Sequence, residues 1–230
     1  MAAVPAMSQP RRALVVRGGW AGHSPRECTE AHLGYLRAAG FAVEIAESLE
    51  VYADADFLAG FDLIVQCWSM GTLTPEQERG LVDAVQAGTG FAGWHGGIIA
   101  TFATNARYLR MVGGRFVWHA DGFVRHSVQV GGTAPDHPIV AGLTDFRVET
   151  EQYWLLSDPL NDVLATTTIP ADDGDPWPEP VTMPVTWTRR WGDGRVFVCT
   201  LGHQLSDFDV PQTRTMIERG MSWAARGFAQ

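Results

Sequence analysis

Three histidines follow predicted strands and are the residues of this chain best placed to carry chemistry. His95 lies in Gly93-Trp94-His95-Gly96-Gly97, where a short apolar run ends between glycines. His23 follows another apolar run and a glycine-rich turn, and His203 follows Leu201-Gly202. Because ligands of parallel α/β sheets bind outside the carboxyl ends of the strands, we expect the three imidazoles to converge at one edge.

Glu151 is the carboxylate that we expect beside these histidines, with Tyr153 two residues further along the same face of a predicted strand. Neutral imidazoles and one carboxylate can hold a divalent metal such as Zn, Mn or Fe, which polarises a substrate or activates water. The same groups can instead transfer protons, because the pKa of histidine is close to neutral pH. Both interpretations stay open. In either case the predicted catalytic residues, which are also the predicted metal ligands, are His23, His95, His203 and Glu151.

Tryptophans accompany these segments. The chain has nine of them in 230 residues, and five lie in or next to the segments that carry the histidines and Glu151. An indole ring offers a flat apolar surface with one polar group, which suits stacking on the CH face of a sugar. Core packing is the alternative for each ring taken singly, but together they favour an aromatic-walled pocket for an uncharged polyol. The predicted substrate-binding residues are Trp20, Trp68, Trp94, Trp118, His119 and Tyr153.

His95 stands where many hydrolases carry a Ser or Cys nucleophile. The sequence has no G-x-S-x-G motif, and Cys67 is predicted to be a buried free thiol. It has no HExxH, EF-hand or Walker motif, and Gly18–Gly22 lacks the spacing of a dinucleotide fingerprint, so no nucleotide cofactor is expected. His32 and His126 are predicted to be structural.

Composition limits the partners that the protein can have. A net charge of -9 without basic runs argues against nucleic acid, and no apolar stretch approaches the ~20 residues that span a bilayer. Three widely spaced cysteines without a CxxC pair indicate reduced thiols and a cytoplasmic location. We expect a small-molecule carbohydrate as partner, and a homo-oligomer stays open.

The predicted elements have the order of a doubly wound, mostly parallel α/β domain. Ser24-Pro25-Arg26-Glu27 and Thr74-Pro75-Glu76-Gln77 each predict a capping box at a helix start. These helices are predicted to end at about Ala39 and near Gly88, each beside a glycine. The strands predicted in this half are Ala13–Val16, Phe41–Ala46, Phe61–Gln66 and Phe91–Trp94.

After Gly113 the pattern becomes antiparallel, with a hairpin turn predicted at Gly192-Asp193-Gly194 and a loop at Ala171–Pro180. Asp209 is predicted to cap a last helix, about Val210–Arg226. Residues 1–11 are predicted to be a disordered lead-in and residues 12–230 a single domain. The strands predicted in this half are Phe123–Val130, Phe146–Leu155, Asp162–Ile169, Val181–Trp191 and Arg195–Thr200.

In its motifs the chain resembles the trehalose-utilisation (ThuA-like) family of the class I glutamine amidotransferase-like superfamily. The segments that carry the resemblance are Gly88–Gly97, Gly113–His119, Asp136–Phe146, Glu149–Tyr153 and Pro184–His203. The resemblance implies a flavodoxin-like three-layer α/β sandwich with additional antiparallel strands in the C-terminal half, and a role in carbohydrate metabolism.

The chain departs from the family and superfamily patterns at two places. Amidotransferases of the superfamily use a Cys at the elbow with a His–Glu pair, whereas this chain has Trp94-His95, so glutamine hydrolysis is not expected. The family's Asp-Glu-x-Tyr segment is Thr150-Glu151-Gln152-Tyr153 here, so its first acid is missing.

The leading hypothesis is a cytoplasmic enzyme, hydrolase- or lyase-like, that acts on a sugar or glycoside, including a keto-sugar derivative. One alternative is a non-catalytic sugar- or partner-binding module on the same fold. A third class is an oligomeric scaffold, in which the Trp-rich rim forms an interface.

Overall fold

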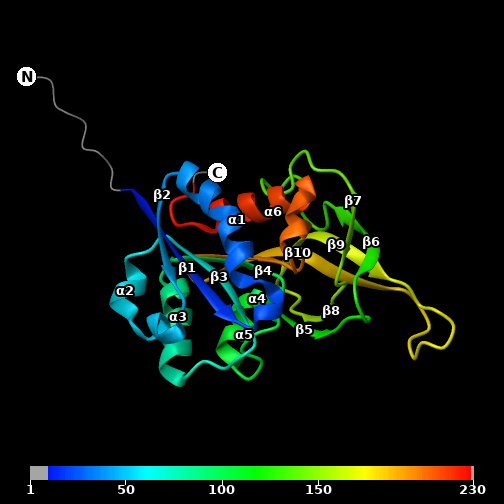
Figure 1. Cartoon of the computed structure of the whole chain (residues 1–230), viewed down its shortest axis with the longest axis horizontal. Coiled ribbons are helices and arrows are strands. Elements are labelled where there is room, and N and C mark those ends of the chain that lie inside the picture. The colour runs from blue at the N-terminus through cyan, green and yellow to red at the C-terminus, as the bar shows by residue number, and fades with distance from the viewer. Residues whose placement is uncertain (1–9, 229–230) are drawn as a thin grey trace, which may run out of the picture.

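A nine-stranded mixed sheet forms the centre of the computed structural model, which describes residues 10–228 (Figure 1). Its strand order is β2-β1-β3-β4-β11-β10-β9-β6-β7. The first five strands are parallel, in the order of a flavodoxin-like sheet, and the last four pair antiparallel. The sequence-based prediction of the fold is therefore confirmed, and a separate pair, β5 and β8, lies beside the main sheet.

The strands agree with the predicted apolar runs in most places. In the parallel half they are β1 (Arg11–Gly19), β2 (Phe41–Ala46), β3 (Leu63–Ser69), β4 (Gly90–Trp94) and β11 (Gly194–Cys199). The others are β5 (Gly114–Trp118), β6 (Val124–Val130), β7 (Phe146–Thr150), β8 (Trp154–Ser157), β9 (Asp162–Ile169) and β10 (Val181–Trp191).

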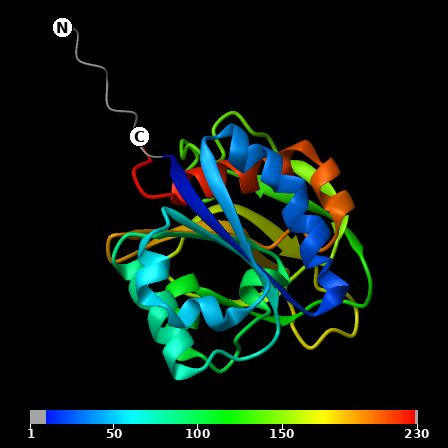
Figure 2. The ribbon, with the colours of Figure 1, turned by 60° about the vertical axis from the view of Figure 1, so that its left-hand side comes forward.

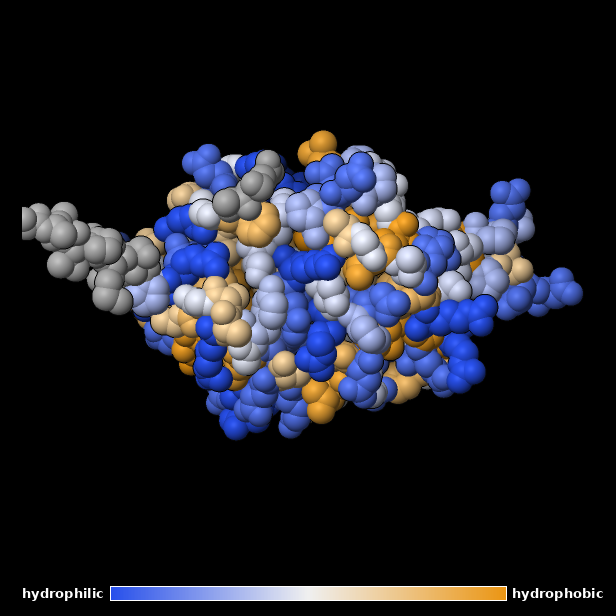
Figure 3. Space-filling model, turned by 90° about the horizontal axis from the view of Figure 1, so that it is seen from above, coloured by the Kyte–Doolittle hydropathy of each residue, from blue (hydrophilic) through white to orange (hydrophobic). Residues whose placement is uncertain are grey.

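Helices cover both faces of the sheet and make the three layers (Figure 2). On one face α1 (Pro25–Ala38) and α6 (Pro211–Ala224) bury a core that includes Leu33, Met216 and Ile217. On the other face α3 (Pro75–Gln86) and α5 (Ala106–Val112) bury Leu81, Val85 and other apolar side chains. Their outer surfaces are polar, as amphipathic helices require: seen over α1 and α6, the surface is mostly hydrophilic with scattered apolar residues (Figure 3). The short helices are η1 (Ala21–His23), η2 (Leu49–Ala53), α2 (Ala55–Ala59), α4 (Gly96–Ile99) and η3 (Leu205–Asp209).

Two of the predicted helix starts need correction. Ser24 is the N-cap residue of α1 and Pro25 its first residue, as predicted, but the predicted capping box is absent: Ser24 has φ 43° and ψ 53°, and its side chain caps no amide of the described chain, because the backbone turns sharply after η1 before α1 begins. Asp209 ends η3, and Val210 takes the N-cap position of α6 without a side-chain bond to a described amide. The capping box of Thr74 and Gln77 is confirmed, with both reciprocal hydrogen bonds present.

The predicted strand Phe146–Leu155 is two strands. β7 pairs with β6 at the edge of the main sheet, whereas β8 pairs with β5 in the small sheet. Residues 151–153 form the passage between them, so Glu151 and Tyr153 do not share a strand face as predicted. The chain changes sheets here, and an apolar run gives no local sign of such a change.

Three further differences concern the chain outside the main strands. Arg11 already belongs to β1 and pairs with Phe41, while residues 1–9 of the predicted lead-in lie outside the described residues. The connection from β2 to β3 holds η2 and α2, which were not predicted but supply the crossover that parallel strands need. In the described chain, none of the helices combines the length and the apolar composition that crossing a membrane requires.

Candidate metal and carbohydrate site

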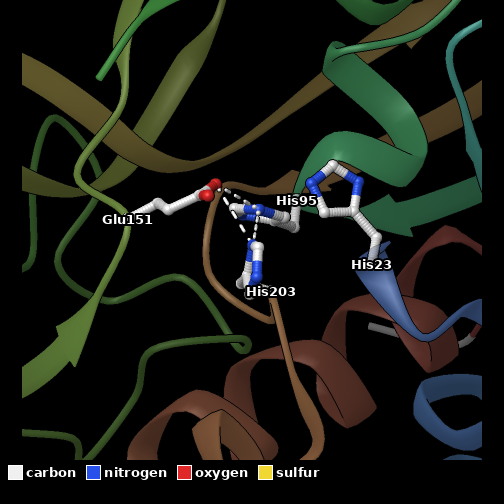
Figure 4. A group of neighbouring side chains, drawn as sticks. All are labelled: His23, His95, Glu151 and His203. Atoms are coloured by element: carbon white, nitrogen blue, oxygen red, sulfur yellow. Dashed lines mark hydrogen bonds and ion pairs between the residues drawn. The ribbon is translucent and has the colours of Figure 1, made fainter. Parts of the chain in front are cut away.

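The carboxyl ends of three strands in the parallel half of the sheet bring the predicted histidines together, with β3 lying between β1 and β4. His23 follows β1, His95 follows β4, and His203 follows β11. Glu151 reaches them from the passage between β7 and β8, and Figure 4 shows His95 and His203 between Glu151 on one side and His23 on the other. One ligand atom of each residue lies within 4.8 Å of the others, and we call these four residues the His–Glu cluster.

Three atoms of the cluster form a nearly equilateral triangle. His95 Nε2 lies 3.1 Å from Glu151 Oε2 and 3.1 Å from His203 Nδ1, and the third side, His203 Nδ1 to Glu151 Oε2, is 3.2 Å. Ligand atoms held at about 2.0–2.2 Å from a shared ion are about 2.8–3.6 Å apart in octahedral or tetrahedral coordination. The triangle therefore has the dimensions of one face of a metal coordination shell.

The local backbone at His95 is strained. Its φ of 49° and ψ of -145° lie outside the regions that side-chain-bearing residues favour, and strain of this kind is concentrated at functional sites. The backbone N–H of His95 donates to the carbonyl of Cys199 at 2.7 Å, which ties the elbow to the end of β11. The glycines that follow give room: a Cβ at Gly97 would lie 2.8 Å from Cys67 Cα.

The hydrogen bonds of His95 determine its tautomer. A carbonyl oxygen can only accept, so Nδ1 must donate its proton to the Thr200 carbonyl at 2.8 Å. In the neutral ring, Nε2 then presents its lone pair to the cluster. Tyr153 O–H donates to that nitrogen at 2.6 Å, and the two rings stack with centroids 4.4 Å apart.

The protonation states favour a cation. Burial lowers the pKa of His95, against the opposing effect of the Glu151 carboxylate, and burial with the neighbouring His95 and His203 lowers the pKa of His23 to about 3. Burial raises the pKa of Glu151, but the adjacent His203 and His95 outweigh it and hold that pKa well below its ordinary value. The ionised carboxylate of Glu151 beside the neutral rings of His23 and His95 places negative charge at the cluster, which favours a cation there.

Asp207 is a buried carboxylate that sequence reasoning missed. Its Oδ2 accepts from Thr150 Oγ1 at 2.7 Å and from the backbone N–H groups of His203 and Gly202 at 2.9 and 3.2 Å. It thus ties the loop that carries His203 to the end of β7, one residue before Glu151. Asp207 lies four residues after His203, and an aspartate is common in turns, so the sequence did not mark it as part of the site.

His119 lies at the edge of the cluster, with Nε2 3.5 Å from Glu151 Oε1 and its ring stacked on Tyr153. Trp20 is half exposed, and its ring packs edge-on against that of His23, with the ring centroids 4.7 Å apart. Phe123, which was not predicted, is also half exposed and contacts the ring of His203 at 5.1 Å.

Two of the predicted aromatic residues are placed differently. Trp94 is 1% exposed and packs against His32 and Phe208 on the α1–α6 side of the sheet, so the prediction that it binds substrate is wrong. Strand residues alternate between faces, and Trp94 faces the core. Trp68 is half-buried against the opposite core, over Gly18.

Trp118 is 44% exposed, and its ring meets that of Trp177 at 6.0 Å. His32 and His126 are buried, with His126 Nδ1 donating to the carbonyl of Val124. The described cysteines, Cys28, Cys67 and Cys199, are buried free thiols whose pKa values burial raises.

Together, these features define an α/β sandwich of flavodoxin-like strand order with a His–Glu cluster at the carboxyl edge of its sheet. The sequence matches the profile described as trehalose utilisation (ThuA) over residues 12–224, and the chain belongs to this family. The family places the protein in carbohydrate metabolism. No curated protein sequence matches the chain.

Solved structures with the same fold include ThuA-like proteins. One from Bacteroides uniformis superposes with a TM-score of 0.75 at 16% identity, covering 96% of this chain and 95% of that one. Another, from Parabacteroides merdae, has a TM-score of 0.68 at 19% identity and covers 96% and 92%. A protein of Salmonella typhimurium described as cytoplasmic has a TM-score of 0.66 at 14% identity and covers 94% and 100%.

Proposed function

We propose that the protein is a cytoplasmic, metal-assisted enzyme that acts on a sugar or glycoside at the His–Glu cluster. The observation that carries this proposal is the triangle of His95 Nε2, His203 Nδ1 and Glu151 Oε2, with sides of 3.1–3.2 Å. Two histidines and one carboxylate on one face form a donor set that suits Fe(II), Zn(II) or Mn(II). The carbonyl of Thr200 orients His95, as outer partners of metal ligands commonly do.

His23 completes the donor set as a fourth ligand or a neighbouring base. Its Nδ1 is 2.6 Å from Ser69 Oγ, which fixes the ring orientation while the ring contacts those of His95 and His203. A divalent ion bound here would polarise a sugar oxygen or lower the pKa of a bound water.

Tyr153 would donate a hydrogen bond and His119 would move protons beside the metal ligands. Burial and the neighbouring Glu151 raise the pKa of Tyr153, so its hydroxyl stays protonated and can donate a hydrogen bond. His119 Nδ1 donates to the carbonyl of Ala120 at 2.6 Å, so in the neutral ring Nε2, 3.5 Å from Glu151 Oε1, carries the lone pair that can take up a proton. Reactions of the hydrolase or lyase type on a glycoside, including a keto-sugar derivative, need proton transfer of this kind.

The deciding experiment titrates the metal-free protein with Zn²⁺, Mn²⁺ and Fe²⁺. Calorimetry measures the affinity, and elemental analysis measures the number of ions bound per chain. We expect one ion per chain in the wild type and at least about a 100-fold loss of affinity in Glu151→Gln and in His203→Asn, because each removes a ligand or its charge. His137→Asn is the matched control, because this half-buried histidine contacts Trp223 away from the cluster.

Wild-type affinity in both ligand variants would refute the metal site. Bound metal and tight sugar binding, but no turnover of any sugar or glycoside offered, would favour the non-catalytic module instead of an enzyme.

A further inference from the structure

A second aromatic site lies next to the cluster. A cavity of about 300 Å³ is lined by Trp118, Gln152, Asp172, Asp175 and Trp177, among others, and we call it the tryptophan pocket. Trp177 belongs to the segment between β9 and β10, which projects from the body of the molecule (yellow in Figure 1). Its ring meets Trp118 at 6.0 Å and Trp154 at 5.1 Å, and its Nε1 donates to the carbonyl of Pro170 at 3.1 Å.

The tryptophan pocket and the cluster share two stretches of backbone. Trp118 lines the pocket, and the next residue, His119, lies 3.5 Å from Glu151. Gln152 lines the pocket, and the preceding residue is Glu151 itself. Because consecutive Cα atoms are about 3.8 Å apart, the tryptophan pocket and the cluster adjoin each other at these two places.

The chemistry of the pocket fits a sugar ring. Indole rings present apolar faces for the CH groups of the ring, while carboxylates accept hydrogen bonds from its hydroxyls. Gln152 is buried, and its Nε2 donates to Thr167 Oγ1 and to the carbonyl of Thr168, so this wall is held in place. Two carboxylates in the pocket and two more on the same loop, Asp173 and Glu179, would repel a phosphorylated sugar.

We propose that the tryptophan pocket binds the second ring of an uncharged two-ring glycoside whose first ring lies at the His–Glu cluster. This inference rests on the proposed function for the first ring only. It assigns Trp177 and Trp118 a role in substrate length and Asp172 and Asp175 a role in excluding anionic sugars.

The test compares trehalose, sucrose and cellobiose with methyl α-glucoside and trehalose 6-phosphate, by calorimetry on the metal-loaded protein. We expect at least one of the uncharged two-ring probes to bind more tightly than the one-ring probe, and trehalose 6-phosphate to bind more weakly than trehalose. Trp177→Ala is expected to weaken binding of that two-ring probe by about five- to tenfold and to leave the one-ring probe unchanged.

Three further variants separate the pocket from the fold and from the metal site. Trp118→Ala removes the other ring without touching the Trp177–Pro170 hydrogen bond, and Trp177→Phe should restore most of the affinity. Leu160→Ala is the control, because this exposed side chain lines a different cavity. All variants should retain one bound metal.

The inference is overturned if both tryptophan variants bind the two-ring probes as the wild type does, or if none of these probes binds better than methyl α-glucoside. Either result would refute the tryptophan pocket and leave the metal site untouched. The metal site is tested separately, by the metal affinities of the Glu151 and His203 variants.

Discussion

The imidazole of His23 packs on Gly96, in the space that a Cβ at position 96 would occupy. The φ of Gly96 is not in the left-handed region, so its backbone conformation does not require a glycine. A glycine is needed there because His23, which follows another strand, occupies the space of a side chain. This contact places the His23 ring against the backbone that follows His95, and so sets its position in the cluster.

Gly96→Ala should displace His23 without straining the backbone. We expect the affinity for Zn²⁺ to fall by about tenfold or more, because one donor leaves its place. Gly34→Ala is the matched control: no heavy atom lies within 4 Å of its added Cβ, it lies within α1, and it should stabilise the protein by about 0.5–1 kcal/mol. Unchanged zinc affinity in Gly96→Ala would mean that His23 does not contribute to the site.

The metal-free protein should lose stability as the pH falls below about 6.5. Burial, together with His95 and His203, lowers the pKa of His23 from 6.5 to about 3, so between these values the unfolded chain binds the additional proton and the folded chain does not. The free energy of unfolding thus falls as the pH is lowered through this window. Urea melts at pH 7, 5.5 and 4 should show a smaller fall in His23→Asn; parallel curves for the two proteins would contradict the assignment.

Asp207→Ala should reduce both stability and metal affinity. It leaves the Thr150 hydroxyl and the N–H groups of Gly202 and His203 without their buried acceptor, which costs about 2–4 kcal/mol. Because the same bonds hold the His203 loop, zinc affinity should fall as well, and Asp207→Asn should recover part of it. A loss of stability with wild-type zinc affinity would make Asp207 a purely structural residue.

Trp94→Phe should lower stability by about 1–3 kcal/mol without changing sugar affinity, because the ring packs against His32 and Phe208 in the core. Denaturant melts and sugar calorimetry on the same sample check the two halves of this prediction. Weaker sugar binding in Trp94→Phe, with the melt unchanged, would restore the role in substrate binding that the sequence suggested.

The convergence of the cluster could be predicted because strand order alone decides it. His23, His95 and His203 each follow a parallel strand, and the ends of such strands meet at one edge whatever the side-chain details. The direction of a side chain at a strand end depends on the register and the twist of the neighbouring strands, which the sequence does not show. For this reason the sequence could not tell that Trp94 faces the core.

Other features depend on tertiary contacts that a local pattern does not contain. The break after Thr150 is a change of sheet within one β-prone run, and Ser24 takes a left-handed conformation that the preceding turn imposes. Trp177 lies in a loop rich in proline and acidic residues, where no periodicity marks a binding side chain.

The placement of Glu151 between two sheets links site occupancy to the docking of a whole substructure. β7 ends on the main sheet and β8 begins the small one, and the carboxylate between them reaches histidines that follow strands of the main sheet. An ion bound by His95, His203 and Glu151 would hold the β5–β8 pair against the main sheet. Close packing of that pair would in turn keep Glu151 in position to bind the ion. Amide hydrogen exchange in β8 should therefore slow on metal loading, even though β8 itself supplies none of the ligands.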